Sequence, residues 1–128
     1  MTPTAGLGVD LARVDRFRRL LRADKAAVVD RLFTAGEKSY ALAKKDPAPY
    51  LAARFAAKEA FLKALGLGLR HGISWQHMEV IRDEFGKPSL QLTGRAAEIF
   101  QERGLSRLLL SYSHDGEYAF ATVILEGP

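Results

Sequence analysis

The stretch from Tyr50 to Leu65 constrains the fold more than any other part of the sequence. It is dominated by alanine, leucine, lysine and glutamate and contains neither glycine nor proline, so it predicts one continuous helix that Gly66 ends. Large apolar side chains recur on one side of this helix, and alanines cover the opposite side. Because alanine is small, we expect another backbone to approach the alanine side closely. The rest of the chain must be arranged around this helix.

Turn and capping signals divide the remaining sequence into short elements. Thr34 and Glu37 have the spacing of a capping box, which predicts a helix to about Lys44, and residues 46–49 break the chain before the long helix. Glycine-containing turns join two predicted hairpins. The other predicted elements are a strand over 5–10, a helix over 13–21, strands over 75–82 and 88–92, a helix over 93–102, and strands over 108–113 and 118–125.

The order of these elements predicts the fold class. Helices are interspersed with strands that pair mostly through hairpins, which is typical of an α+β fold with a mainly antiparallel sheet and helices packed on one face. A chain of 128 residues has the usual size of one domain, so we expect a single domain over residues 1–128.

Composition excludes several kinds of chemistry. The chain has no cysteine, so disulfides, thiolate nucleophiles and thiol-bound metals are ruled out. The sequence shows neither a secretory signal nor an apolar run long enough to cross a membrane, and we expect a cytoplasmic protein with no membrane partner. Lys and Arg number 19 against 15 Asp and Glu, a formal net charge of +4 that favours anionic partners.

Two carboxylates and a lysine are the strongest candidates for a catalytic site. Asp10 follows an apolar strand, and Glu59 and Lys63 lie four residues apart at the border between the two sides of the long helix. Two carboxylates together with phosphate oxygens are the usual surroundings of Mg²⁺. The simpler alternatives are a turn aspartate and an ordinary Glu–Lys helix pair.

Basic and glycine-containing positions form a second group of candidates. Lys58 projects within the apolar stripe, where its ammonium must reach solvent or find an anion, and with Arg54 it indicates a phosphate site. His114 ends a strand and can donate to a phosphate when protonated, although such a histidine can also be merely exposed. The segment 86–88 can bring backbone close to a flat ligand, or form a plain hairpin.

Five sequence blocks resemble a known family, the holo-acyl-carrier-protein synthases, which are the short branch of the 4′-phosphopantetheinyl transferases. The resemblance covers nearly the whole chain, and its most specific part is the block from Arg54 to Ala64 with lysine four residues beyond glutamate. The other blocks are Gly6-Leu7-Gly8-Val9-Asp10, Phe33-Thr34 with Glu37, Gly86-Lys87-Pro88, and Ser111-Tyr112-Ser113-His114 with Tyr118-Ala119.

The resemblance implies an Mg²⁺-dependent transfer of 4′-phosphopantetheine from coenzyme A to a serine of an acyl carrier protein in fatty acid biosynthesis, with release of 3′,5′-ADP. By similarity, Asp10 and Glu59 hold Mg²⁺, Glu59 deprotonates the serine directly or through a water, and Lys63 assists the departing phosphate. The residues implied to bind coenzyme A are Arg54, Lys58, Gly86, Lys87, Pro88, Ser113 and His114.

The family also implies how the chain meets its partners. Its first helix docks the acidic carrier protein, and Arg16 and Arg22 match the docking positions better than the neighbouring arginines 13, 18 and 19, for which a solvated basic face is an equal alternative. Short members are homotrimers with sites between subunits. His114 and the segment 86–88 of one protomer are therefore expected to face Asp10, Glu59 and Lys63 of the next.

The sequence departs from the family pattern at one position, and two other functions are compatible with parts of it. Asp46 stands where some relatives have a base, in a segment expected near the 3′-phosphate of coenzyme A. A basic α+β module that binds RNA through its sheet would also explain the charge, but its aromatic residues are scattered and it leaves Asp10 and Glu59 unexplained. A purely structural subunit explains neither the carboxylates nor Lys58, so we expect no nucleic-acid partner.

Overall fold

The computed structural model describes residues 2–128, and its centre is the helix α4, Ala48–Leu65. Thirteen of the 18 residues of α4 are buried, so both its large apolar side and its alanine side lie against other elements. Pro49 is accommodated in the first turn, where its missing N–H costs nothing, and Gly66 ends the helix in the left-handed conformation at φ 74°. The helix thus begins two residues earlier than predicted.

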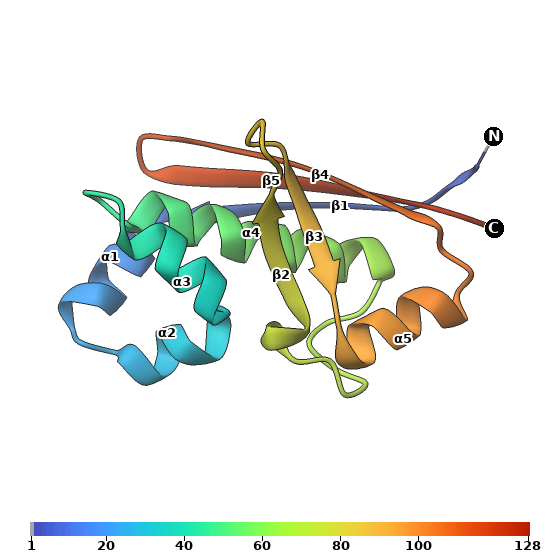
Figure 1. Ribbon diagram of the computed structural model, residues 1–128, viewed down its shortest axis with the longest axis horizontal. Helices are drawn as coiled ribbons and strands as arrows, with labels where there is room; N and C mark the ends of the chain where they lie inside the picture. The colour runs from blue at the N-terminus through green and yellow to red at the C-terminus, as the bar shows by residue number, and fades with distance from the viewer. Residues whose placement is uncertain (1) are drawn as a thin grey trace.

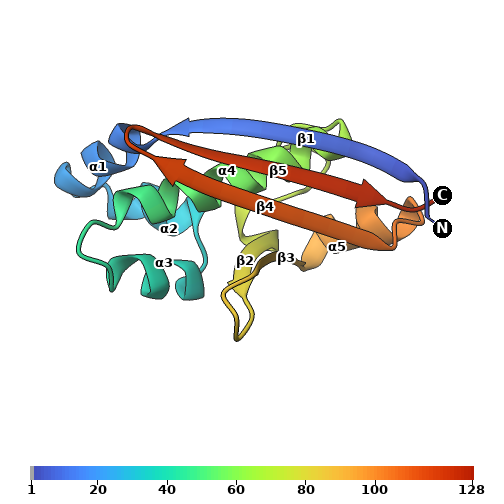
Figure 2. The same ribbon diagram turned by 90° about the horizontal axis from the view of Figure 1, so that it is seen from above.

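One layer of the molecule is a three-stranded antiparallel sheet that lies across α4 (Figure 2). Its strands are β1 (Thr4–Arg13), β5 (Tyr118–Glu126) and β4 (Arg107–Asp115), in the order β1-β5-β4. A tight turn with Gly116 at φ 58° joins β4 to β5. The predicted α+β class and the antiparallel pairing are confirmed.

The backbone of β1 lies directly on the alanine side of α4. A side chain at Gly8 would overlap the carbonyl oxygen of Ala60, and one at Gly6 would overlap that of Ala64. Only glycine permits this approach, because any Cβ would separate strand from helix. The close contact expected on the alanine side is therefore confirmed.

The remaining elements cover the other sides of α4 (Figure 1). Helices α1 (Val14–Arg22), α2 (Ala26–Leu32) and α3 (Ala35–Leu42) gather at its N-terminal end. The hairpin of β2 (Met78–Arg82) and β3 (Pro88–Leu92) crosses it, and α5 (Gly94–Glu102) follows. Within residues 2–128 no helix covers the outer face of the three-stranded sheet, where Leu7 is 61% and Leu11 59% exposed.

Several elements differ from the predictions. Strand β1 continues three residues beyond its predicted end, so Asp10 lies within the strand, paired with Ala121, rather than after it. Helix α2 was not predicted: it has only seven residues and no side-chain cap, too short for a helical period to show, and its buried Val29 and Leu32 hold it in place. The strand predicted over 75–82 begins three residues later, because Ser74 caps the 3₁₀-helix η1, Trp75–His77. The capping box of Thr34 and Glu37 is present at α3.

No helix among residues 2–128 has the length and apolar character that a bilayer crossing requires.

The close contact between β1 and α4 predicts how glycine substitutions change the stability of the protein. Gly8→Ala should lower the free energy of unfolding by about 3 kcal/mol or more, because the new methyl group meets backbone that cannot move aside. Gly68→Ala is the matched control, since its methyl group would touch only the side chain of Arg70 at 3.6 Å, and it should change stability by about 0.5 kcal/mol or less. Urea denaturation of both variants measures the difference, and equal stabilities would contradict the packing described.

Candidate functional site

Asp10, Glu59 and Lys63 come together where the end of β1 meets α4. The Lys63 Nζ donates to Asp10 Oδ1 at 2.9 Å and to the carbonyl oxygen of Val9 at 3.1 Å. Glu59 lies one turn before Lys63, and its pKa is raised, first by partial burial and then by the negative charge of Asp10. The three residues singled out by sequence are therefore neighbours in space.

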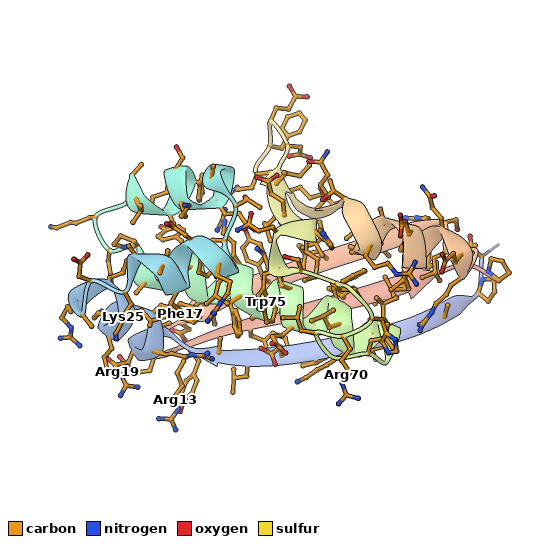
Figure 3. All side chains as sticks on the ribbon, turned by 90° about the horizontal axis from the view of Figure 1, so that it is seen from below. Arg13, Phe17, Arg19, Lys25, Arg70 and Trp75 are labelled. Atoms are coloured by element: carbon orange, nitrogen blue, oxygen red, sulfur yellow. The ribbon has the colours of Figure 1, made fainter. Side chains whose placement is uncertain are left out.

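Asp10 and Glu59 line a cleft of about 1070 Å³, which we call the carboxylate cleft, and Lys63 lies beside it through its contact with Asp10. One side is cationic and the other apolar, and Figure 3 shows Arg13 and Arg19 projecting at the α1 end, with Trp75 farther along. The Arg16 guanidinium lies 5.0 Å from the centre of the Phe55 ring. The lining residues are Asp10, Leu11, Ala12, Arg13, Arg16, Arg19, Arg31, Leu32, Phe55, Glu59, Leu69, Ile73, Ser74 and Trp75.

The carboxylate pair fits a divalent cation. The charge of Asp10 makes ionisation of Glu59 harder, and a cation between them would remove that repulsion. Within residues 2–128 no three His, Asp or Glu side chains gather into a metal site, so the other oxygens around such a cation would come from water and a ligand. This is the arrangement in which Mg²⁺ binds a phosphate-bearing substrate.

A second group of basic residues surrounds two tyrosine rings on the other flank of α4. The Arg54 guanidinium lies 4.3 Å from the centre of the Tyr40 ring, and the Lys44 ammonium lies 4.6 Å from the same ring. The Tyr50 ring meets Tyr40 at 6.0 Å and His114 at 5.5 Å. These contacts place Arg54 and His114, from distant parts of the sequence, in one cationic cluster.

This cluster borders a smaller cleft of about 520 Å³, the tyrosine cleft. Arg82 donates from Nη1 to the Tyr40 hydroxyl at 2.6 Å, and the buried Nε of Arg54 has no hydrogen-bond partner among residues 2–128. The unpaired buried donor of Arg54 fits an anionic ligand, and the lining around it is mixed, with two arginines and three carboxylates. The lining residues are Gly36, Tyr40, Arg54, Glu79, Val80, Ile81, Arg82, Asp83, Glu84 and Gly86.

Asp46 does not oppose this cationic cluster. Its carboxylate accepts from Arg18 at 2.8 Å, and the hydrogen bond to Arg18 lowers the pKa of Asp46. The acid that departs from the family pattern is thus neutralised by α1.

Lys58 is placed differently from the sequence prediction. It is fully buried, and its ammonium donates to Glu37 Oε1 at 2.6 Å and to the carbonyl oxygens of Leu32 at 2.7 Å and Trp75 at 3.3 Å. Burial lowers the pKa of Lys58, and the charge of Glu37 opposes that change. The assignment of Lys58 to phosphate binding is contradicted, because its ammonium faces Glu37 inside the core and borders neither cleft.

Other predicted residues are only partly brought together. Ser113 pairs with Phe120 on the exposed face of the sheet, whereas His114 pairs with the buried Ala119, so their side chains point to opposite faces. Of the segment 86–88, only Gly86 lines the tyrosine cleft. Arg16 lines the carboxylate cleft, but Arg22 does not and lies 3.8 Å from Asp15.

Sequence reasoning missed several residues of both clefts. Tyr40 and Arg82 belong to no motif, and they are 42 residues apart, so no local spacing connects them. Arg31 lies on the unpredicted helix α2. Trp75, the one tryptophan of the chain, was assigned to a strand, and its place in the cleft depends on η1.

Comparison with known proteins shows what the chain is similar to. The family model described as the 4′-phosphopantetheinyl transferase superfamily matches residues 6–123. A holo-[acyl-carrier-protein] synthase of Syntrophotalea carbinolica is 65% identical over 123 residues, which are 96% of each chain.

Solved structures agree. A holo-[acyl-carrier-protein] synthase from Neisseria meningitidis superposes with a TM-score of 0.88 at 34% identity, covering 97% of this chain and 99% of that one. One from Bacillus anthracis, in complex with coenzyme A (3′,5′-ADP), has a TM-score of 0.80 at 31% identity and covers all of both chains.

The raised pKa of Glu59 predicts how the metal-free protein responds to pH. A carboxyl whose pKa is higher in the folded than in the unfolded state destabilises the fold once it is ionised. Glu59→Gln should therefore stabilise the protein in EDTA above the raised pKa, by at most about 1 kcal/mol because water screens the half-exposed group. The gain should shrink as the pH falls through that pKa, where Glu59 becomes protonated.

Thermal unfolding across a pH series measures this gain. Glu98→Gln on α5 is the control, because Glu98 lies outside both clefts and its carboxylate is exposed. A destabilising Glu59→Gln change at neutral pH would contradict the electrostatics of the pair.

Proposed function

The chain belongs to the 4′-phosphopantetheinyl transferase superfamily, and we propose that it transfers 4′-phosphopantetheine from coenzyme A to a serine of an apo acyl carrier protein. The observation that carries the proposal is the carboxylate pair of Asp10 and Glu59 beside Lys63, in a cleft with a cationic wall. The proposal includes Mg²⁺ dependence, release of 3′,5′-ADP, and a role in fatty acid biosynthesis in the cytoplasm.

In this proposal Asp10 and Glu59 hold Mg²⁺. The ion, when bound, would neutralise the diphosphate of coenzyme A and stabilise the charge that develops on the transferred phosphoryl group. The carboxylate oxygens fit it because they face the same cleft and repel each other in its absence. In this structure the Lys63 ammonium donates to Asp10 Oδ1. Because 55% of the Lys63 side chain is exposed, the ammonium can turn toward a departing phosphate.

Glu59 would also accept the proton of the serine. The serine oxygen forms a bond to phosphorus, the bond from phosphorus to 3′,5′-ADP breaks, and the serine proton passes to Glu59 directly or through a water. In the metal-free protein the pKa of Glu59 is raised, mainly by partial burial, and a raised pKa makes a carboxylate a stronger base.

The walls of the carboxylate cleft are suited to an acidic protein partner. Arg13 ends β1, Arg16 and Arg19 lie on α1, and Phe55 and Trp75 provide an apolar surface in the same cleft. A carrier protein with acidic and apolar side chains near its serine would match both. Arg16 keeps its proposed docking role, and for Arg22 the role rests on the family resemblance alone.

The positions of the proposed phosphate-binding residues favour a site that a second copy of the chain completes. Arg54 and His114 belong to the cluster around Tyr40 and Tyr50, and the tyrosine cleft shares no lining residue with the carboxylate cleft. We therefore infer a homotrimer in which each site combines the carboxylate cleft of one protomer with Arg54, His114 and the segment 86–88 of the next. In the same inference Ser113 approaches from the sheet face.

The outer face of the three-stranded sheet supports this assembly. Leu11 of β1 pairs with Phe120 of β5, and Leu7, Val9 and Tyr118 lie on the same face; all five side chains are more than 40% exposed. A contiguous apolar patch of this kind is typical of a surface that another chain covers. In a closed ring of three protomers, each protomer would bury its own copy of this patch.

The function makes a direct prediction. With Mg²⁺, coenzyme A and an apo carrier protein, the enzyme should add the mass of one phosphopantetheine group to the carrier, as read by mass spectrometry. Asp10→Ala should abolish the gain without unfolding the protein, because it removes a polar ligand and no core volume. Glu98→Ala, which changes an acid outside both clefts, is the control and should remain active. Salt-sensitive RNA binding with no mass gain would favour the nucleic-acid alternative.

The shared site makes a separate prediction. Light scattering should report three chains, and His114→Ala and Asp10→Ala proteins, each inactive, should regain activity after they are refolded together. If chains mix at random, about a quarter of the sites combine an intact His114 with an intact Asp10. Proven chain exchange with no recovery would place the whole site within one chain.

A further inference from the structure

Lys58 has no hydrogen-bond donor left for a ligand. An ammonium carries three hydrogens, and those of Lys58 are directed to Glu37, Leu32 and Trp75. The side chain is completely buried, so a phosphate cannot approach without displacing part of the core. Its role in the enzyme must therefore come from what it holds inside the protein.

Glu37 supplies the neutralising charge. Its Oε1 accepts from the Lys58 ammonium at 2.6 Å and from the Thr34 amide at 2.9 Å, and its Oε2 accepts from the Val80 amide at 2.8 Å. The carboxylate is fully buried as well. A buried ion pair adds little net stability over an apolar pair of the same volume, so stability alone does not account for it.

The two carbonyl contacts of Lys58 reach the wall of the carboxylate cleft. Leu32 is the last residue of α2 and Trp75 the first of η1, and both line that cleft. The Trp75 ring packs against Phe55 at 5.2 Å, one turn before Lys58 on α4. A single buried ammonium thus ties two separate segments to the helix that carries Glu59.

We propose that Lys58 is a positioning residue whose buried ammonium, neutralised by Glu37, holds the Leu32 and Trp75 wall of the carboxylate cleft at a fixed place relative to Glu59. The proposal rests on the proposed function for its effect on transfer. Its structural part stands separately, because the position of Trp75 is measurable without substrate.

The test compares Lys58→Met with Arg54→Met, two buried cations on the same helix. Because Trp75 is the one tryptophan, its fluorescence reports the wall directly. Lys58→Met should increase quenching of Trp75 by acrylamide and lower kcat/KM for the apo carrier by about tenfold or more, since small displacements of a site wall are costly. The Kd for 3′,5′-ADP should stay within about twofold of wild type. Arg54→Met should show the opposite pattern: it should weaken 3′,5′-ADP binding and leave the acrylamide quenching of Trp75 unchanged.

A double variant keeps the test valid if Lys58→Met fails to fold. Lys58→Met/Glu37→Gln removes both charges of the buried ion pair, so neither is left unpaired and the protein should fold, yet it still lacks the contacts to Leu32 and Trp75. It should show the same quenching and the same loss of kcat/KM. Wild-type quenching and transfer in the double variant, or a loss of 3′,5′-ADP affinity equal to that of Arg54→Met, would overturn the proposal. An inactive wild-type enzyme would instead refute the proposed function, and the quenching comparison would still decide the role of Lys58.

Discussion

The contact between the backbone of β1 and the alanine side of α4 is the constraint on which the rest of the structure depends. Gly6 and Gly8 have no side chain to hold the strand away from Ala60 and Ala64. This close contact brings Asp10, two residues after Gly8 on the same strand, within hydrogen-bonding distance of Lys63. The motif that resembles a catalytic signature is therefore also a packing device, because the glycines bring the carboxylate to the helix.

The same helix separates two groups of charge. Its β1 flank brings Glu59 beside Asp10 of β1 and faces the arginines of α1, whereas its other flank carries Arg54 and faces the tyrosines and His114. Lys58 lies between them in the core and is neutralised by Glu37. An assembly of several chains would explain this division, because the carboxylates of one protomer could then lie next to the basic residues of another.

Local signals in the sequence predicted the elements whose formation is itself local. The capping box of α3, the glycine stop of α4 and the glycine turns need only neighbouring residues, and each is present. Helix α2 and the cluster around Tyr40 and Tyr50 were not predicted, because contacts between distant parts of the chain determine them. Lys58 is the instructive case: the sequence required an anion for its buried ammonium, and it was Glu37, 21 residues earlier, rather than a phosphate.

A crystal structure of the protein with Mn²⁺ and coenzyme A tests the central claim most directly, because anomalous scattering locates the metal and the nucleotide shows which chains form the site. The account predicts Mn²⁺ between Asp10 and Glu59 of one protomer, with the phosphates of coenzyme A reaching Arg54 and His114 of a neighbouring protomer. Coenzyme A bound entirely within one chain, or a metal site away from Asp10 and Glu59, would contradict it.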